Sequence, residues 1–189
     1  MWTFLVTEVL FFGGLFTAYV YYRSIFPQGF AEGSHHNDVL LGAINTAVLI
    51  CSSFTMAIGV HGAEGGNRRQ VILALLGTIL IGLVFLFIKG YEYYVHYQDH
   101  LVPGLNFHYP GELSGQVHIF MTFYFVMTGM HALHMIIGIC IMMLLIPLMW
   151  WGKLKLSNPN AIEMTGLYWH FVDIIWIFLF PLFYLIERG

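Results

Sequence analysis

Five long apolar stretches dominate the chain, and short polar segments separate them. The stretches comprise residues 2–22, 39–60, 71–97, 115–151 and 161–186. Each is long enough to cross a bilayer, because a membrane-spanning helix needs about 20 predominantly apolar residues. Turn-forming residues such as Pro27 and Pro103 fall between the stretches. The pattern predicts an all-α polytopic membrane bundle of five transmembrane helices.

The fourth stretch is longer than a membrane requires. At about 1.5 Å per residue, about 35 residues give roughly 50 Å, whereas the hydrocarbon core is about 30 Å thick. This helix is therefore expected to tilt or to protrude. The last helix is expected to begin with Asn158 as its cap and Pro159 in its first turn.

Composition supports the same class. The chain is 59% hydrophobic and 9% charged, and its mean hydropathy is +0.76, whereas soluble domains are about 25% charged. Five spans in 189 residues leave no room for a separate soluble domain, so residues 1–189 are expected to form a single transmembrane domain. The net charge of −3 gives no indication of nucleic-acid binding.

Basic residues between the spans predict the orientation of the bundle. Cytoplasmic segments of membrane proteins carry an excess of Lys and Arg. One side of the bundle carries Arg68, Arg69, Lys153 and Lys155, and the other carries Arg23 and Arg188. The N-terminus is therefore expected in the cytoplasm and the C-terminus outside.

Ionisable residues interrupt the fourth and fifth spans. In the fifth span, Glu163, His170 and Asp173 share one helical face, and in the fourth His131 and His134 do so. A carboxylate at the membrane centre costs about 2.5 to 3.5 kcal/mol, so it should face protein. Counted from the helix ends, the two groups lie at similar depth. We expect a buried polar network that joins the two helices.

Three roles are open for this network. It can fix the bundle by interhelical hydrogen bonds, line a path for protons or substrate, or ligate a metal or haem. A b-type haem needs histidines from facing helices, which His131 or His134 with His170 could supply. Asp173, one turn from His170, and the lack of a glycine-lined haem groove argue against a haem. We favour the structural role and predict no metal site.

Two further groups of ionisable residues lie in the spans. Lys89, Glu92 and His96 form a stripe on the third span near the outer surface, where snorkelling explains them. Glu8 stands in the first span with no cation nearby in the sequence. Burial should raise the pKa of such a carboxyl, so Glu8 is the stronger functional candidate.

Five segments of the chain resemble successive signatures of subunit III of the haem-copper oxidases. They are Thr7–Phe12, Asn45–Leu49, Glu92–Tyr94, Thr128–Gly138 and Tyr168–Trp176. Their order agrees along almost the whole chain, which makes the resemblance specific. Longer members have seven helices, and this chain resembles the bacterial form that lacks the first two.

The resemblance implies an accessory subunit that binds the catalytic subunit I and has no cofactor or redox centre of its own. Haems and copper would lie in partner subunits. The family supports proton uptake and the turnover lifetime of the oxidase, and it holds phospholipids in a cleft. The two leading helices form one wall of that cleft, so here a partner would have to supply it. The carbodiimide-reactive carboxylate of the family corresponds to Glu8.

The resemblance also implies partners and a location. Quinol-oxidase relatives usually carry aspartate at the position of Glu8, which favours a cytochrome c oxidase. Subunit II, membrane lipids and cytochrome c as electron donor are further expected partners, in the cytoplasmic membrane of a bacterium. The alternatives are a subunit III of a quinol oxidase or nitric oxide reductase, and a b-haem membrane electron carrier.

Overall fold

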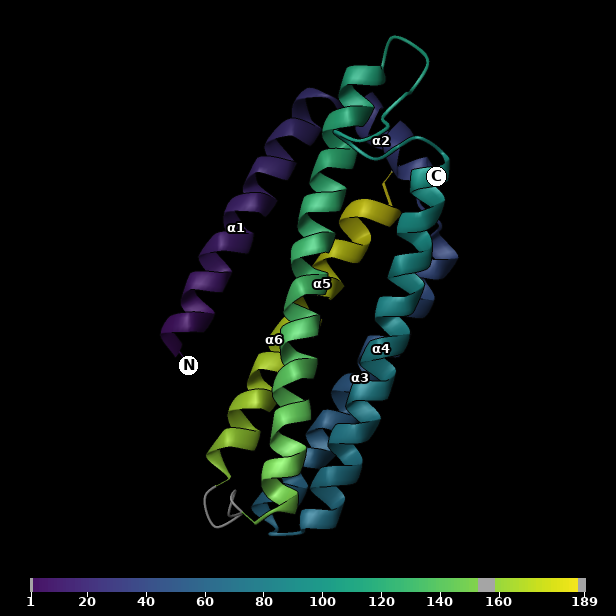
Figure 1. Ribbon diagram of the computed structural model, residues 1–189. Helices are drawn as coiled ribbons and strands as arrows, with labels where there is room; N and C mark the ends of the chain where they lie inside the picture. The colour runs from purple at the N-terminus through teal and green to yellow at the C-terminus, as the bar shows by residue number, and fades with distance from the viewer. Residues whose placement is uncertain (1, 153–158, 187–189) are drawn as a thin grey trace. The chain divides into compact units, whose positions relative to one another are not determined.

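The structure is a computed structural model that describes residues 2–152 and 159–186. In these residues the chain forms six α-helices and no strand (Figure 1). The helices are α1 (Trp2–Ile25), α2 (Pro27–His35), α3 (Val39–Glu64), α4 (Arg68–Gln98), α5 (Ser114–Trp150) and α6 (Asn160–Tyr184).

Five of these helices, all except α2, are long and apolar enough to cross a membrane. The predicted five-helix architecture is therefore confirmed. α5 is one helix of 37 residues, about 56 Å long at 1.5 Å per residue, so it exceeds the membrane thickness as expected. The residues used to predict orientation and the cap of the last helix include Lys153, Lys155, Asn158 and Arg188, which lie outside the described residues.

Polar caps set the starts of two membrane-spanning helices. Asp38 Oδ1 accepts hydrogen bonds from the backbone N–H groups of Leu40 at 2.8 Å and Leu41 at 3.3 Å, directly before α3. Asn67 Oδ1 accepts from the N–H of Gln70 at 3.2 Å, so α4 begins at Arg68, before the predicted apolar stretch. Such caps satisfy N–H groups that have no partner within the helix.

Helix α2 corrects the expectation that Pro27 lies in a turn between two helices. Proline fits the first helical turn because its missing N–H has no helical partner there, and the chain bends one residue earlier, at Phe26. Gly33 brings α2 close to α5, since a Cβ on Gly33 would lie 2.4 Å from Cδ1 of Phe120. The same residue types that signal a turn thus form a closely packed helix.

The chain divides into two compact units. Unit 1 comprises Met1–Ala43, Ile88–Met130 and Ile177–Gly189, and unit 2 comprises Ile44–Phe87 and His131–Trp176. Helices α3, α4, α5 and α6 each contribute a segment to both units. Each unit is described separately below.

The core of unit 1 is aromatic. The ring of Tyr19 on α1 meets Phe30 of α2 and Phe183 of α6 edge-on, with centroids 5.3 and 5.1 Å apart. Phe120 of α5 completes the contact, 5.5 Å from Phe30. All four side chains are buried. Edge-to-face geometry adds about 0.5 to 1.5 kcal/mol per pair beyond simple burial, so this cluster holds α1, α2, α5 and α6 together.

Two buried tryptophans on α6 organise the core of unit 2. Trp169 Nε1 donates to Ser52 Oγ at 2.8 Å, and Trp176 Nε1 donates to Thr46 Oγ1 at 3.1 Å, which ties α6 to α3. Gly138 lets α5 approach, because a Cβ there would lie 2.9 Å from Cε3 of Trp169. The core therefore pairs large aromatic rings with a glycine and with satisfied indole donors.

Candidate functional site

A buried ion pair lies inside unit 1. Lys89 Nζ donates to Glu92 Oε2 at 3.0 Å, to the Tyr124 hydroxyl at 3.0 Å and to the Tyr184 hydroxyl at 2.8 Å. The two tyrosine hydroxyls in turn donate to Glu92 Oε1 at 2.8 and 2.5 Å. We call these four residues the Lys89–Glu92 cluster. It joins α4 to α5 and α6.

The Lys89–Glu92 cluster corrects the sequence interpretation of this stripe. Lys89 and Glu92 are only 3% and 2% exposed, so Lys89 does not snorkel to the surface. Their spacing of three residues places them on one helical face, but their partners come from α5 and α6. Because the cluster uses all three N–H donors of the ammonium, much of the desolvation penalty is offset.

His96 continues the stripe and is also buried, at 2% exposure. Its Nδ1 donates to the backbone carbonyl of Glu92 at 2.7 Å, and a 3.0 Å hydrogen bond joins its Nε2 to Asn37 Oδ1. Asn37 Nδ2 donates to the carbonyl of Phe183 at 2.9 Å, and Ser34 Oγ donates to the same carbonyl at 3.1 Å. Carbonyls at a helix C-terminus lack helical partners, so these side chains cap α6.

In unit 2, His170 and Asp173 meet α3. A 2.6 Å hydrogen bond joins His170 Nδ1 to Ser53 Oγ. The Ser53 hydroxyl also lies close to the Asp173 carboxyl, but no hydrogen bond joins the two groups. Asp173 is 4% exposed, and neither of its oxygens has a well-formed hydrogen bond to any described residue. Ser53 could not be identified from the sequence, because nothing in its own segment marks it.

His170 also lines a pocket of about 440 Å³ at the surface of unit 2. Three further titratable residues line it: His61, Glu64 and Glu163. His61 and Glu64 are exposed and form an ion pair of 3.8 Å when the histidine is protonated, whereas Glu163 and His170 are half-buried. We call this site the polar pocket. It places Glu163 and His170 together, as their shared helical face predicts.

His131 and His134 are buried in unit 2 as expected, at 1% and 7% exposure. The His131 ring lies 5.5 Å from Phe85 and 5.2 Å from Trp176, between centroids. The backbone carbonyl of His134 accepts a 2.9 Å hydrogen bond from the Tyr168 hydroxyl. Interhelical contacts thus surround both histidines, but the partner observed for His170 is Ser53 of α3.

Glu8 is half-buried on α1, in unit 1, and its neighbours Val9 and Leu10 are exposed. Much of α1 is exposed in the same way, including Val6, Val20 and Tyr21. Glu8 and the polar pocket fall in different units, so nothing places them in one site. In residues 2–152 and 159–186, no three His, Cys, Asp or Glu side chains are arranged to hold a metal ion.

The fold and these sites define a polytopic α-helical membrane protein with titratable side chains buried inside each unit. Residues 1–187 match the sequence model of the family described as cytochrome c oxidase subunit III. The chain belongs to this family, which confirms the resemblance found in the five sequence segments. It is thus part of an oxidoreductase complex of the haem-copper type, embedded in a membrane with other oxidase subunits.

Several relatives resemble the chain along nearly its whole length. A cytochrome c oxidase subunit 3 from Synechocystis sp. is 36% identical over 97% of this chain and 72% of its own length. One from Thermostichus vulcanus is 35% identical over 98% of this chain and 85% of its own. A haem-copper oxidase subunit I+III from Aeropyrum pernix is 31% identical over 98% of this chain, which spans 22% of that protein.

Proposed function

We propose that this chain is the accessory subunit III of a bacterial cytochrome c oxidase, and that it supports proton uptake and turnover stability of the catalytic subunit I. It carries no redox centre in this proposal, and the haems and copper lie in partner subunits. Direct contact with subunit I is supported by the Aeropyrum pernix relative, whose name joins subunits I and III in one protein. Subunit II completes the core, and cytochrome c is the electron donor.

One observation carries the proton-uptake role: titratable groups lead from the surface of unit 2 to a buried carboxyl. The polar pocket collects histidine and carboxylate side chains at the surface. From the pocket, His170 is hydrogen-bonded to Ser53, whose hydroxyl lies close to the Asp173 carboxyl. A serine hydroxyl both donates and accepts hydrogen bonds, and histidine titrates near neutral pH. These groups can therefore exchange a proton between the pocket and Asp173.

The location of the polar pocket fits this role in the proposed orientation. The pocket is lined by the C-terminal end of α3 and the N-terminal half of α6. With the N-terminus in the cytoplasm, this end of both helices faces the cytoplasmic side of the bacterial inner membrane. An oxidase that pumps protons outward takes them up from that side.

Glu8 has a second, separate part in the proposal. It is a half-buried carboxyl on a helix whose surface is largely exposed apolar side chains. We assign it as the intramembrane carboxyl that reacts with carbodiimides and protects the turning-over enzyme.

The test uses the purified oxidase with and without this chain, and with His170→Ala or Asp173→Asn. Proton uptake is followed by stopped flow with a pH indicator during oxidation of the reduced enzyme. We expect proton uptake to be slower when the chain is removed and in both variants. The rate of electron transfer from reduced cytochrome c that precedes proton uptake should stay the same. Unchanged uptake after removal of the chain would contradict the proposed function.

The alternatives give different results in the same preparation. A quinol oxidase would be active with quinol and inactive with reduced cytochrome c. A b-haem carrier would lose one haem signal in the reduced-minus-oxidised spectrum of His170→Ala, whereas we expect every haem to remain. Either outcome would overturn the proposal.

A further inference from the structure

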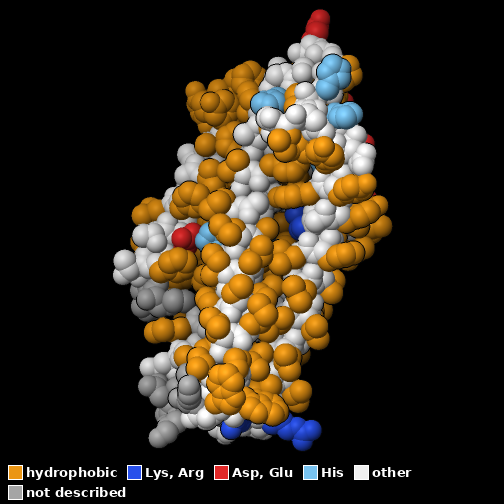
Figure 2. All heavy atoms as spheres, in the orientation of Figure 1, with side chains coloured by type: hydrophobic (Ala, Val, Ile, Leu, Met, Phe, Trp, Pro, Cys, Tyr) orange, Lys and Arg blue, Asp and Glu red, His pale blue; other side chains and the backbone are white. Residues whose placement is uncertain are grey.

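His96 lies in the last turn of α4, at the end of unit 1 that carries α2 and the loop between α4 and α5. Figure 2 shows histidine and acidic side chains at the upper end of the view, where Figure 1 places α2 and this loop. His35 and His36 of this end are exposed, whereas His96 is buried. The proton path proposed above lies in unit 2 and does not use His96.

Both ring nitrogens of His96 face oxygen atoms. Nδ1 lies 2.7 Å from the backbone carbonyl oxygen of Glu92, and Nε2 lies 3.0 Å from Oδ1 of Asn37. These oxygens accept hydrogen bonds and cannot donate them. A neutral imidazole has one N–H donor, whereas an imidazolium has two. The geometry therefore suits the protonated ring, because a neutral ring would direct a lone pair at one of the two oxygens.

The orientation of the Asn37 amide is fixed from its other side. Its Nδ2 donates to the backbone carbonyl of Phe183 at 2.9 Å, so Oδ1 turns toward His96. The opposite orientation would let Nδ2 donate to a neutral His96, but it would place Oδ1 against the Phe183 carbonyl. Ser34, at 3.1 Å, would then be the remaining donor to this carbonyl of α6. The protonation state of His96 thus selects between two amide orientations, and the protonated state gives α6 the fuller cap.

Several groups around His96 stabilise a positive charge on its ring. The carboxylates of Glu92 and Asp99 attract this charge, whereas the Lys89 ammonium repels it. Tyr124 of α5 stacks on the ring, with centroids 5.3 Å apart, and a cation over an aromatic face is favoured. The last turn of a helix also favours a cation. Burial opposes the charge, so the ring keeps its proton only while these contacts are intact.

We propose that protonation of His96 locks Asn37 onto the C-terminal end of α6, so that unit 1 is held more firmly at low pH than at high pH. In the proposed orientation this end of α4 lies on the outer side of the membrane, which an outward proton pump acidifies. The lock therefore tightens as protons accumulate on that side. The proposal concerns unit 1 alone and stands even if the proposed proton uptake through unit 2 fails its test.

The protonation state is measured by solid-state nuclear magnetic resonance on the intact oxidase complex with nitrogen-15-labelled histidine. The signal of His96 is the one that His96→Gln lacks. We expect this signal to show two protonated ring nitrogens at about pH 6, and one bare nitrogen when the pH is raised. A bare ring nitrogen on His96 at about pH 6 would overturn the proposal.

The structural consequence is measured by hydrogen exchange and mass spectrometry on peptides that cover residues 179–186 of α6. Rates are corrected for the intrinsic pH dependence of exchange. Protection in the wild-type complex should be about tenfold greater at about pH 6 than at about pH 8, and His96→Gln should remove this difference. Ser34→Ala removes a donor to Phe183 that does not titrate, so it should lower protection equally at both pH values.

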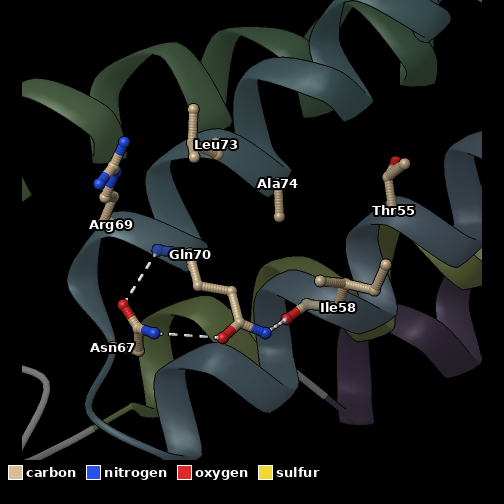
Figure 3. Close-up of a pocket in the computed structure, with 7 residues that line it drawn as sticks. All are labelled: Thr55, Ile58, Asn67, Arg69, Gln70, Leu73 and Ala74. Carbon is tan, nitrogen blue, oxygen red and sulfur yellow. Dashed lines mark hydrogen bonds between the residues drawn. The ribbon is translucent and has the colours of Figure 1, made fainter.

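Asn67, directly before α4, supplies a matched control. Its amide is also held at both atoms, because Nδ2 donates to Gln70 Oε1 at 3.4 Å and Oδ1 accepts from the Gln70 N–H at 3.2 Å (Figure 3). Gln70 does not titrate, so Asn67→Ala should leave the pH dependence at residues 179–186 unchanged. Equal protection of the wild type at both pH values would overturn the proposal, even if His96→Gln fails to assemble. A pH dependence that persists in an assembled His96→Gln complex would overturn it as well.

Discussion

Replacing Lys89 by methionine removes an ammonium group from the Lys89–Glu92 cluster and keeps a side chain of similar length. Glu92 would remain almost fully buried, at 2% exposure. Removing one partner of a buried ion pair costs about 3 to 5 kcal/mol. Tyr124 and Tyr184 would still donate to Glu92 Oε1 at 2.8 and 2.5 Å. We therefore expect a loss near the lower limit, about 3 kcal/mol of unfolding free energy.

The measurement is reversible unfolding of the complex in mixed micelles with increasing sodium dodecyl sulfate, followed by tryptophan fluorescence. Adding Glu92→Gln to Lys89→Met should recover about 2 kcal/mol, because a neutral amide still accepts from both tyrosines without a buried charge. Tyr97→Phe is the control. Tyr97 is exposed on the same helix, so its change should stay within about 0.5 kcal/mol.

Two results would refute this reasoning. If Lys89→Met were as stable as wild type, the ammonium would reach the membrane surface by snorkelling, as the sequence pattern first indicated. If the double variant were no more stable than the single one, the uncompensated charge of Glu92 would not be the cause of the loss.

Three further changes test other parts of the structure. Glu8 should react slowly with a hydrophobic carbodiimide, and Glu8→Ala should reduce the number of turnovers before inactivation more than the initial rate; complete loss of initial activity would contradict an auxiliary role. Gly33→Leu should destabilise unit 1 by about 1 to 3 kcal/mol in the same unfolding assay, because its Cβ would lie 2.4 Å from the Phe120 ring. Gly115→Leu is the control and should not destabilise unit 1, because Gly115 has open space around it. Ser53→Ala should weaken unit 2 by about 0.5 to 1.5 kcal/mol and slow proton uptake as His170→Ala does; normal uptake would exclude Ser53 from the path.

The five spans could be predicted because the thickness of the hydrocarbon core sets the length of the apolar run that a membrane-spanning helix needs. Helix α2 could not be predicted in the same way. Pro27 and Gly29 are turn formers in isolation, and the local sequence contains no sign that α5 lies against them. Contact with Phe120 makes a helix with glycine at position 33 favourable, and that contact exists only in the folded chain.

The candidate sites were predictable within one helix and not between helices. Spacing placed Lys89 beside Glu92 and His170 beside Asp173, because residues three apart share a face. Their partners were not predictable. Tyrosines are common at membrane interfaces, so nothing in the sequence distinguishes Tyr124 and Tyr184. Ser53 is one small polar residue among apolar neighbours. The sequence therefore underestimates the burial of Lys89, because the tyrosines that surround its ammonium group could not be predicted.

The two buried polar arrangements differ in how fully their hydrogen-bonding capacity is used, and this difference separates their roles. In the Lys89–Glu92 cluster, every ammonium proton has an acceptor and both carboxylate oxygens have donors. Moving a proton there would disrupt several strong bonds at once. Neither carboxyl oxygen of Asp173, in contrast, has a hydrogen-bond partner among the described residues. Under the proposed function, changes at Lys89 should therefore alter stability, whereas changes at Asp173 should alter proton uptake.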